Sequence, residues 1–184
     1  MGSTSLIKAL VTSAFVLTCT GCGDRDRDKI AVPVVIGSSE NTATPLEPFR
    51  LWLPRGLPKE PRLGSCALDR VGNANAGDAF ALTAGESLLA EGWVADASRG
   101  ALAKVAWLVL QGERGDFHVT AELGQRRPDV AAALGKRQLA ESGYRVRATT
   151  QGLPAGKYLV AIHSADGNGL LICDTHRIAH ILPP

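Results

Sequence analysis

The chain lacks the features that mark several large classes of protein. Aromatic residues make up only 5% of its 184 residues, and the formal net charge of +2 is too small to make nucleic acid the expected partner. No charge-free apolar stretch reaches the roughly 20 residues that a helix needs to span a bilayer. The sequence also contains no G-x-S-x-G nucleophile turn, no H-E-x-x-H zinc motif and no phosphate-binding P-loop. These absences exclude a multi-pass membrane protein and leave no familiar catalytic motif.

The first 21 residues have the pattern of an export signal. Lys8 provides the positive start, residues 9–20 form an apolar stretch, and Cys22 stands just before the charged residues 24–29. This arrangement resembles a bacterial lipoprotein signal, in which the cysteine after the cleavage site is lipidated and becomes the first residue of the mature protein. We therefore expect a signal peptide over 1–21, a palmitate-type lipid anchor on Cys22, and a membrane-anchored domain that faces the periplasm or the cell exterior.

Three alternatives at the N-terminus stay open. Cleavage before Cys19 would place the bulkier Thr18 at the scissile bond, so it is the less favoured site. An ordinary secretory signal and an uncleaved anchor also fit the same segment. A redox role for Cys19 and Cys22 requires a βαβ context, which an apolar leader does not provide.

Two cysteines remain for the mature domain, Cys66 and Cys173. Two cysteines in an exported protein are expected to pair, and this pair closes a loop of 173 − 66 = 107 residues. Such a bridge stabilises a fold by about 4 to 5 kcal/mol on the chain-entropy model. The alternative is two unpaired buried thiols.

The composition divides the rest of the chain into a tether and a folded domain. Residues 22–61 contain six of the ten prolines, which block helices and cannot donate to a central sheet ladder. Residues 62–184 alternate between short apolar strands and turns rich in glycine and asparagine. We expect an all-β fold there, an antiparallel β-sandwich of seven or eight strands with one short helix near 128–134. Trp93 and Trp107 are expected to face each other across its core.

Four phrases of the folded part recur together in a known kind of module. They are residues 91–96, 127–133, 142–144 and 152–158, and in this order they resemble an Ig-like β-sandwich of bacterial envelope and glycan-related proteins. The resemblance implies an Ig-like fold and an extracytoplasmic setting, and it transfers no active site. It marks seven residues as structural determinants of the fold: Trp93, Asp96, Arg127, Pro128, Asp129, Gly143 and Tyr144.

Positive charge concentrates between residues 126 and 147, where six basic residues face only two acidic ones. A solvated strand face explains this pattern simply. The sharper hypothesis is a surface for anionic glycans or lipid head groups, formed by Arg137, Arg145 and Arg147.

The function expected from these patterns is a non-catalytic binding or structural module with an envelope glycan or protein as partner. We expect no cofactor and no metal, since His176 and His180 would lie about 13 Å apart along an extended strand, too far to share one zinc ion. The alternative is an accessory hydrolase, transferase or metal-binding protein with a hidden site near His163, Asp174 and His176.

Overall fold

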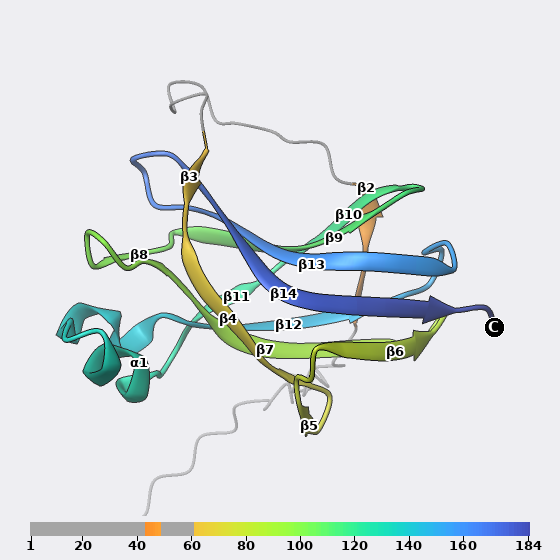
Figure 1. Ribbon diagram of the computed structural model, residues 1–184, viewed down its shortest axis with the longest axis horizontal. Coiled ribbons are helices and arrows are strands. Elements are labelled where there is room, and N and C mark those ends of the chain that lie inside the picture. The colour runs from red at the N-terminus through yellow and green to blue at the C-terminus, as the bar shows by residue number, and fades with distance from the viewer. Residues whose placement is uncertain (1–42, 49–60) are drawn as a thin grey trace, which may run out of the picture. The chain divides into compact units, whose positions relative to one another are not determined.

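The computed structural model describes residues 43–48 and 61–184 of the chain. The expected signal peptide, the lipidation site at Cys22 and most of the tether lie outside these residues. The described part forms two layers of strands, with the short helix α1 at the end of the layers opposite the C-terminus (Figure 1). The predicted all-β sandwich is therefore confirmed. Within this part, no helix has the length and apolar character needed to cross a membrane.

The first layer, sheet A, is built around three long neighbouring strands. Its strand order is β1-β12-β7-β4-β5, with β11 also paired to β12 and β8 to β7. The strands are β1 (Thr44–Pro45), β4 (Ser65–Val71), β5 (Ala74–Asn75), β7 (Ser87–Asp96), β8 (Ala101–Leu102), β11 (Glu122–Gln125) and β12 (Gly143–Thr149).

The second layer, sheet B, has the order β2-β10-β9-β13-β14-β3, and β6 also pairs with β14. The strands are β2 (Glu47–Pro48), β3 (Arg62–Leu63), β6 (Ala79–Thr83), β9 (Val105–Gly112), β10 (Gly115–Thr120), β13 (Gly156–Ala165) and β14 (Leu170–Leu182). Eight strands of the two sheets have five or more residues, as predicted. The expectation of a wholly antiparallel sandwich is wrong, because the pairs β1·β12, β14·β3 and β14·β6 are parallel.

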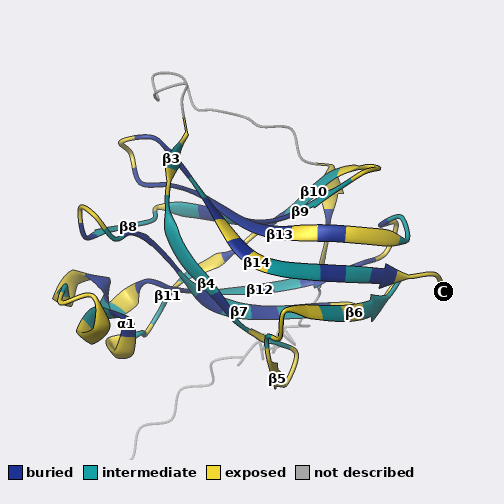
Figure 2. Ribbon diagram, viewed as in Figure 1, coloured by how far each residue is buried: buried dark blue, intermediate teal, exposed yellow. Residues whose placement is uncertain are grey.

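The core lies between the two sheets and follows the alternation of the strands. Val146 of β12 faces inward from sheet A, while Leu108 of β9 and Ile162 of β13 face inward from sheet B. All three side chains are at most 1% exposed, and Figure 2 shows buried residues along the middle strands of both layers. Apolar side chains at every second position thus bury one face of each sheet.

The two tryptophans do not meet across this core, which corrects the sequence-based expectation. Trp93 and Trp107 are half-buried and stand next to the core residues Val94 and Leu108. Since successive side chains of a strand point to opposite faces, both indoles lie on the outer faces of their sheets. The apolar run of β9 conceals its period of two, and so the sequence left the inward side of this strand ambiguous.

The sandwich begins earlier in the chain than the predicted boundary at residue 62. β1 pairs with β12 in sheet A, and β2 pairs with β10 in sheet B. Leu46, between them, is 8% exposed and belongs to the core. The segment 43–48 therefore closes one side of the sandwich and is not part of a free tether.

A further correction concerns residues 117–123, in which apolar residues alternate with polar ones and so predict one strand. The chain instead changes sheets at Ala121, leaving sheet B at the end of β10 and entering sheet A as β11. The short helix is where it was expected, as α1 (Pro128–Ala133), and is followed by a 3-10 turn, η1 (Arg137–Glu141). Gly135, with φ of +63°, allows the turn between them.

A disulfide joins the two layers. Cys66 of β4 in sheet A and Cys173 of β14 in sheet B are bonded, with their Cα atoms 6.0 Å apart. The predicted pairing is confirmed, and the alternative of two free thiols is wrong.

A buried ion cluster, which we call the Arg62 cluster, brings together side chains from both sheets. Arg62 of β3 lies 2.6 Å from a carboxylate oxygen of Asp96 and 3.3 Å from one of Asp166. The two aspartates are only 2% and 5% exposed. Burial alone would raise the pKa of Asp96, but hydrogen bonds from Ser98 and Arg62 outweigh it and bring the pKa to about 2. Asp96, expected as a structural determinant, thus has a structural partner.

Candidate functional site

A polar cleft opens beside sheet A, where β4, β7, β11 and β12 come together. Its volume is about 410 Å³, which is within the range of small-molecule sites. Arginines, carboxylates and amides dominate its lining: Asp69, Arg70, Asn75, Glu91, Gly92, Gln125, Arg126, Arg127, Tyr144 and Arg145. Most of these residues stand on strands, which hold a site more precisely than loops do.

A β-bulge in β4 shapes one wall of the cleft. The pairing of β4 with β7 shifts register between Leu68 and Arg70, so that Asp69 is the extra residue. The Asp69 carbonyl accepts a hydrogen bond from the N–H of Ala76 at 2.7 Å, which folds the following turn back against the bulge. A bulge turns a side chain out of the regular alternation, and Asp69 and Arg70 both line the cleft as a result.

The floor of the cleft depends on a close approach between Gly92 and Tyr144. These residues are direct partners in the pairing of β7 with β12. A Cβ atom on Gly92 would lie 2.0 Å from the Ala67 carbonyl oxygen and 2.7 Å from the Tyr144 hydroxyl. Only glycine fits there.

Tyr144 is held in the floor by burial and by one hydrogen bond. Its side chain is 1% exposed, and its hydroxyl donates to the Ala67 carbonyl at 3.1 Å. Burial raises the pKa of the Tyr144 phenol far above its usual range. The phenol therefore stays protonated, and it acts as part of the scaffold.

Arg127 is fully occupied by two carboxylates. Its guanidinium lies 2.6 Å from an oxygen of Asp69 and 2.7 Å from one of Asp129. The hydrogen bond to Asp129 is the main reason that the pKa of Arg127 is raised, and in return it lowers the pKa of Asp129 to about 2. The backbone N–H of Arg127 also donates to Ala140 at 2.7 Å. These contacts connect Arg127 to β4, α1 and η1.

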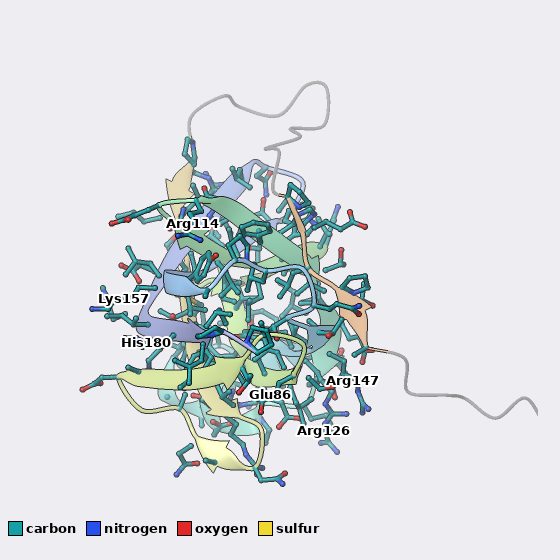
Figure 3. All side chains as sticks on the ribbon, turned by 90° about the vertical axis from the view of Figure 1, so that its right-hand side faces the viewer. Glu86, Arg114, Arg126, Arg147, Lys157 and His180 are labelled. Carbon is teal, nitrogen blue, oxygen red and sulfur yellow. A yellow bond between two sulfur atoms is a disulfide. The ribbon has the colours of Figure 1, made fainter. Side chains whose placement is uncertain are left out.

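The other three arginines of the cleft differ in their partners. Arg145 of β12 donates to Glu91 of β7 at 2.7 Å. Neither Arg70 nor Arg126 makes an ion pair with any residue of the described ranges. Both are exposed, and Figure 3 shows Arg126 and Arg147 at the same edge of the molecule. The cleft thus contains two guanidinium groups without a carboxylate.

The surface for anionic ligands predicted at Arg137, Arg145 and Arg147 is only partly assembled. Arg145 and Arg147 stand two residues apart on β12 and share its outer face, since they alternate with the core residue Val146. Arg137 lies in η1, a separate element, and it does not line the cleft. The structure brings Arg145 together with Arg70 and Arg126 in its place.

Two of the remaining predicted determinants have a clear local role. A Cβ atom on Gly143 would lie 2.6 Å from the Gln125 carbonyl, so glycine permits the close pairing of β12 with β11. Pro128 is the first residue of α1, where its missing N–H is tolerated. Trp93 lies opposite Gly143 on the neighbouring strand.

The alternative site near His163, Asp174 and His176 is not gathered into one accessible cluster. Asp174 lies 3.3 Å from Nδ1 of His176, whose side chain is 85% exposed. His163 on β13 is only 4% exposed and pairs across the sheet with Trp107 and Ile172. Burial lowers the pKa of the His163 imidazole. Among residues 43–48 and 61–184, no group of three or more His, Cys, Asp or Glu side chains is placed to hold a metal ion.

Of the ten residues that line the cleft, sequence reasoning named only Arg127, Tyr144 and Arg145 as site residues. It did not single out Asp69, Arg70, Asn75 or Gln125 as site residues. Their recruitment depends on the bulge at Asp69 and on the change of sheet at Ala121, and neither feature has a local sequence signal. The turn-rich residues 72–77 were the only hint that β4 folds back at this point.

Comparison of the chain with protein-family models, with curated proteins and with solved structures finds no match, so the geometry of the site has to carry its interpretation.

Proposed function

We propose that this chain is an exported, lipid-anchored protein of the bacterial envelope whose β-sandwich is a non-catalytic module that binds glycans. Its ligand site is the cleft beside sheet A. The observation that carries the proposal is the lining of this cleft, in which Arg70, Asn75 and Gln125 stand on strands of sheet A and Arg126 directly follows β11, all without a carboxylate partner. An Ig-like module from the same envelope setting, which the sequence resembles, is in keeping with this proposal.

The disulfide supports the export of the chain. Bonds such as Cys66–Cys173 persist in oxidising compartments and are rare in the cytosol. Together with the signal-like pattern over 1–21, it favours a folded domain outside the cytoplasm, attached to a membrane through Cys22.

The groups in the cleft favour binding over bond cleavage. A general base or nucleophile needs a lone pair that is directed at the substrate. The carboxylates of Asp69 and Glu91 are instead engaged by Arg127 and Arg145, and the Tyr144 hydroxyl is engaged by a backbone carbonyl.

An indole beside the cleft favours a sugar as the ligand. Trp93 stands two residues after Glu91 on β7 and therefore shares the face on which the cleft opens. Its side chain is half-buried, which leaves part of a flat apolar ring next to polar groups. Sugar rings combine apolar C–H faces with hydroxyl groups, and this pairing of surfaces matches them.

Membrane attachment is tested with two matched cysteine variants. Cys22→Ser removes the expected lipidation site, whereas Cys19→Ser changes a cysteine of the leader. Fractionation of cells is expected to show the native chain and Cys19→Ser with the membranes and Cys22→Ser released from them or retained as precursor. Membrane attachment that survives Cys22→Ser contradicts the proposal.

Binding is tested with a bulky residue placed in the cleft. Asn75→Trp fills it from β5, while Asn73→Trp adds the same ring at an exposed position of the same turn that does not line the cleft. Binding of the detergent-solubilised full chain to a panel of envelope glycans is measured by biolayer interferometry. We expect Asn75→Trp to abolish binding and Asn73→Trp to preserve it. Equal binding by both variants, or no binding by the native chain, overturns the assignment.

A further inference from the structure

We infer that the cleft is specific for an acidic sugar residue, whose carboxylate is clamped between Arg70 and Arg126 while its hydroxyls contact Asn75 and Gln125. This inference rests on the proposed function and adds the chemical class of the ligand. The arginines that it assigns to an anionic ligand are Arg70 and Arg126, in place of the set at 137, 145 and 147 that the sequence suggested.

The pairing of charges singles out Arg70 and Arg126. Four arginines line the cleft, and three carboxylates contact them: Asp69, Glu91 and Asp129. All three carboxylates are engaged by Arg127 or Arg145. Arg127 with its two carboxylates carries 1 − 2 = −1 and the Arg145–Glu91 pair is neutral, whereas the two guanidinium groups that have no ion pair together carry +2.

The neighbours of these two arginines hold their backbones in place. Arg126 directly precedes Arg127, whose N–H and side chain are fixed by Ala140 and by two carboxylates. Arg70 directly follows the bulged Asp69, and its guanidinium lies 3.4 Å from the Asn73 carbonyl. A ligand therefore needs to order only the outer part of each side chain, which reduces the entropic cost of binding.

A guanidinium presents several N–H donors in one plane, which matches the two oxygens of a carboxylate. Two guanidinium groups that line one cleft can each donate to a different oxygen of the carboxylate, or both can donate to the same two oxygens. The ligand brings a negative charge to the two guanidinium groups that have no carboxylate partner.

The rest of the lining matches hydroxyl groups. The side-chain amides of Asn75 and Gln125 make no hydrogen bond within residues 43–48 and 61–184. Each amide offers both donors and an acceptor, as hydroxyls require. The volume of about 410 Å³ is near the lower end of the range for small-molecule sites. These features fit a ring of sugar size that carries one oxyanion, such as a uronic acid.

The test compares an acidic sugar with its neutral counterpart on the detergent-solubilised full chain. Digalacturonate and galactobiose serve as the probes, and binding is measured by isothermal titration calorimetry at low and at physiological salt. The variants are Arg70→Gln and Arg126→Gln. Arg137→Gln is the matched control, because it removes the same charge from an exposed arginine outside the cleft.

We expect digalacturonate to bind, galactobiose to bind at least tenfold more weakly, and each cleft variant to lose roughly tenfold or more in affinity for digalacturonate. Arg137→Gln is expected to stay within about twofold of the native chain. Affinity falls as salt rises, because the clamp is exposed. Thermal unfolding of the variants shows whether each one folds.

The contrary outcomes are distinct. Equal binding of the two probes, with both sensitive to Asn75→Trp, overturns the acidic-sugar inference and leaves the proposed glycan-binding function in place. Loss of binding in Arg137→Gln to the same extent as in Arg126→Gln shows a diffuse charge effect and also overturns the clamp. Failure of the native chain to bind any glycan overturns both proposals.

Discussion

The Arg62 cluster and the cleft are made of the same two kinds of side chain, but the excess of charge has opposite sign. In the cluster, one guanidinium lies between two buried carboxylates. The four arginines that line the cleft have three carboxylate partners between them, and two of the arginines have no ion pair among the described residues. A buried charge without a partner inside the protein is costly, whereas an exposed charge is solvated by water and can bind a ligand. The comparison separates charges that stabilise the fold from charges that are available for binding.

The region around the Arg62 cluster also contains the disulfide, since Cys66 follows Arg62 by four residues and links the two sheets. We expect the double variant Cys66→Ala, Cys173→Ala to lose about 2 to 5 kcal/mol of unfolding free energy, the largest effect in this set. Chemical denaturation of the native chain with and without reductant, beside the variant, measures it. A reduced native chain as stable as the oxidised one would mean that the bridge contributes nothing to holding the sheets together.

Removal of the shared cation is expected to have the next largest effect. Arg62→Met leaves Asp166 buried without a cationic partner and Asp96 with only the exposed Arg99 at 4.0 Å. Because the Arg62 side chain is 31% exposed, the loss is expected to be about 2 to 4 kcal/mol, somewhat less than for a fully buried pair.

Arg99→Met is the matched control for that variant. Arg99 lies 4.0 Å from Asp96, but its side chain is 55% exposed. We expect it to change stability by less than about 0.5 kcal/mol. Similar losses in the two variants, measured by the same denaturation experiment, would show that Arg62 has no special role.

Acidification probes the same cluster with a smaller effect. The pKa of Asp96 is lowered from 3.8 to about 2, so its contribution to stability is complete above pH 4 and is lost as the pH falls through 2. The expected loss is roughly 1 to 2 kcal/mol between these limits. Arg62→Met should lose less over this interval, since it lacks one of the hydrogen bonds that lower the pKa. Denaturation curves at pH 5, 3 and 2 test this, and parallel losses in both proteins would contradict it.

The sequence allowed the layers and their bridge to be predicted, because those depend on local patterns. Strand alternation predicted seven or eight strands, and eight strands have five or more residues, although the pattern joined β10 and β11 into one. The parity of the cysteines predicted the link between Cys66 and Cys173. The helix near 128–134 has two local signals, a proline at its first position, Pro128, and a glycine just past its end, Gly135. Each of these signals lies within a few residues or depends on a simple count.

The cleft and the Arg62 cluster could not be predicted, because they depend on register and on contacts between distant residues. Arg62 and Asp166 are 104 residues apart in the chain, and so are brought together only by the packed sheets. Asp69 enters the cleft through a bulge of a single residue, and such a shift changes which face a side chain occupies. Segment 43–48 has the proline content of a tether, yet the burial of Leu46 draws it into both sheets.

The smallest expected effect on stability distinguishes, within the cleft, an arginine that stabilises the fold from one that is available to a ligand. Arg127→Gln removes the partner of Asp69 and Asp129, and we expect it to cost about 1 kcal/mol of unfolding free energy because the Arg127 side chain is only 21% exposed. Arg126→Gln breaks no ion pair and should change stability by less than about 0.5 kcal/mol.

Arg126 and Arg127 are adjacent in the segment between β11 and α1, and each substitution removes one positive charge. A difference in stability between the two variants therefore cannot come from net charge. If Arg126→Gln destabilises the fold as much as Arg127→Gln does, Arg126 belongs with the structural charges of the sandwich. An unchanged unfolding curve combined with lost affinity for an acidic sugar is the result that a binding residue gives. Arg127 then belongs to the charges that stabilise the fold, and the adjacent Arg126 belongs to the charges that bind the ligand.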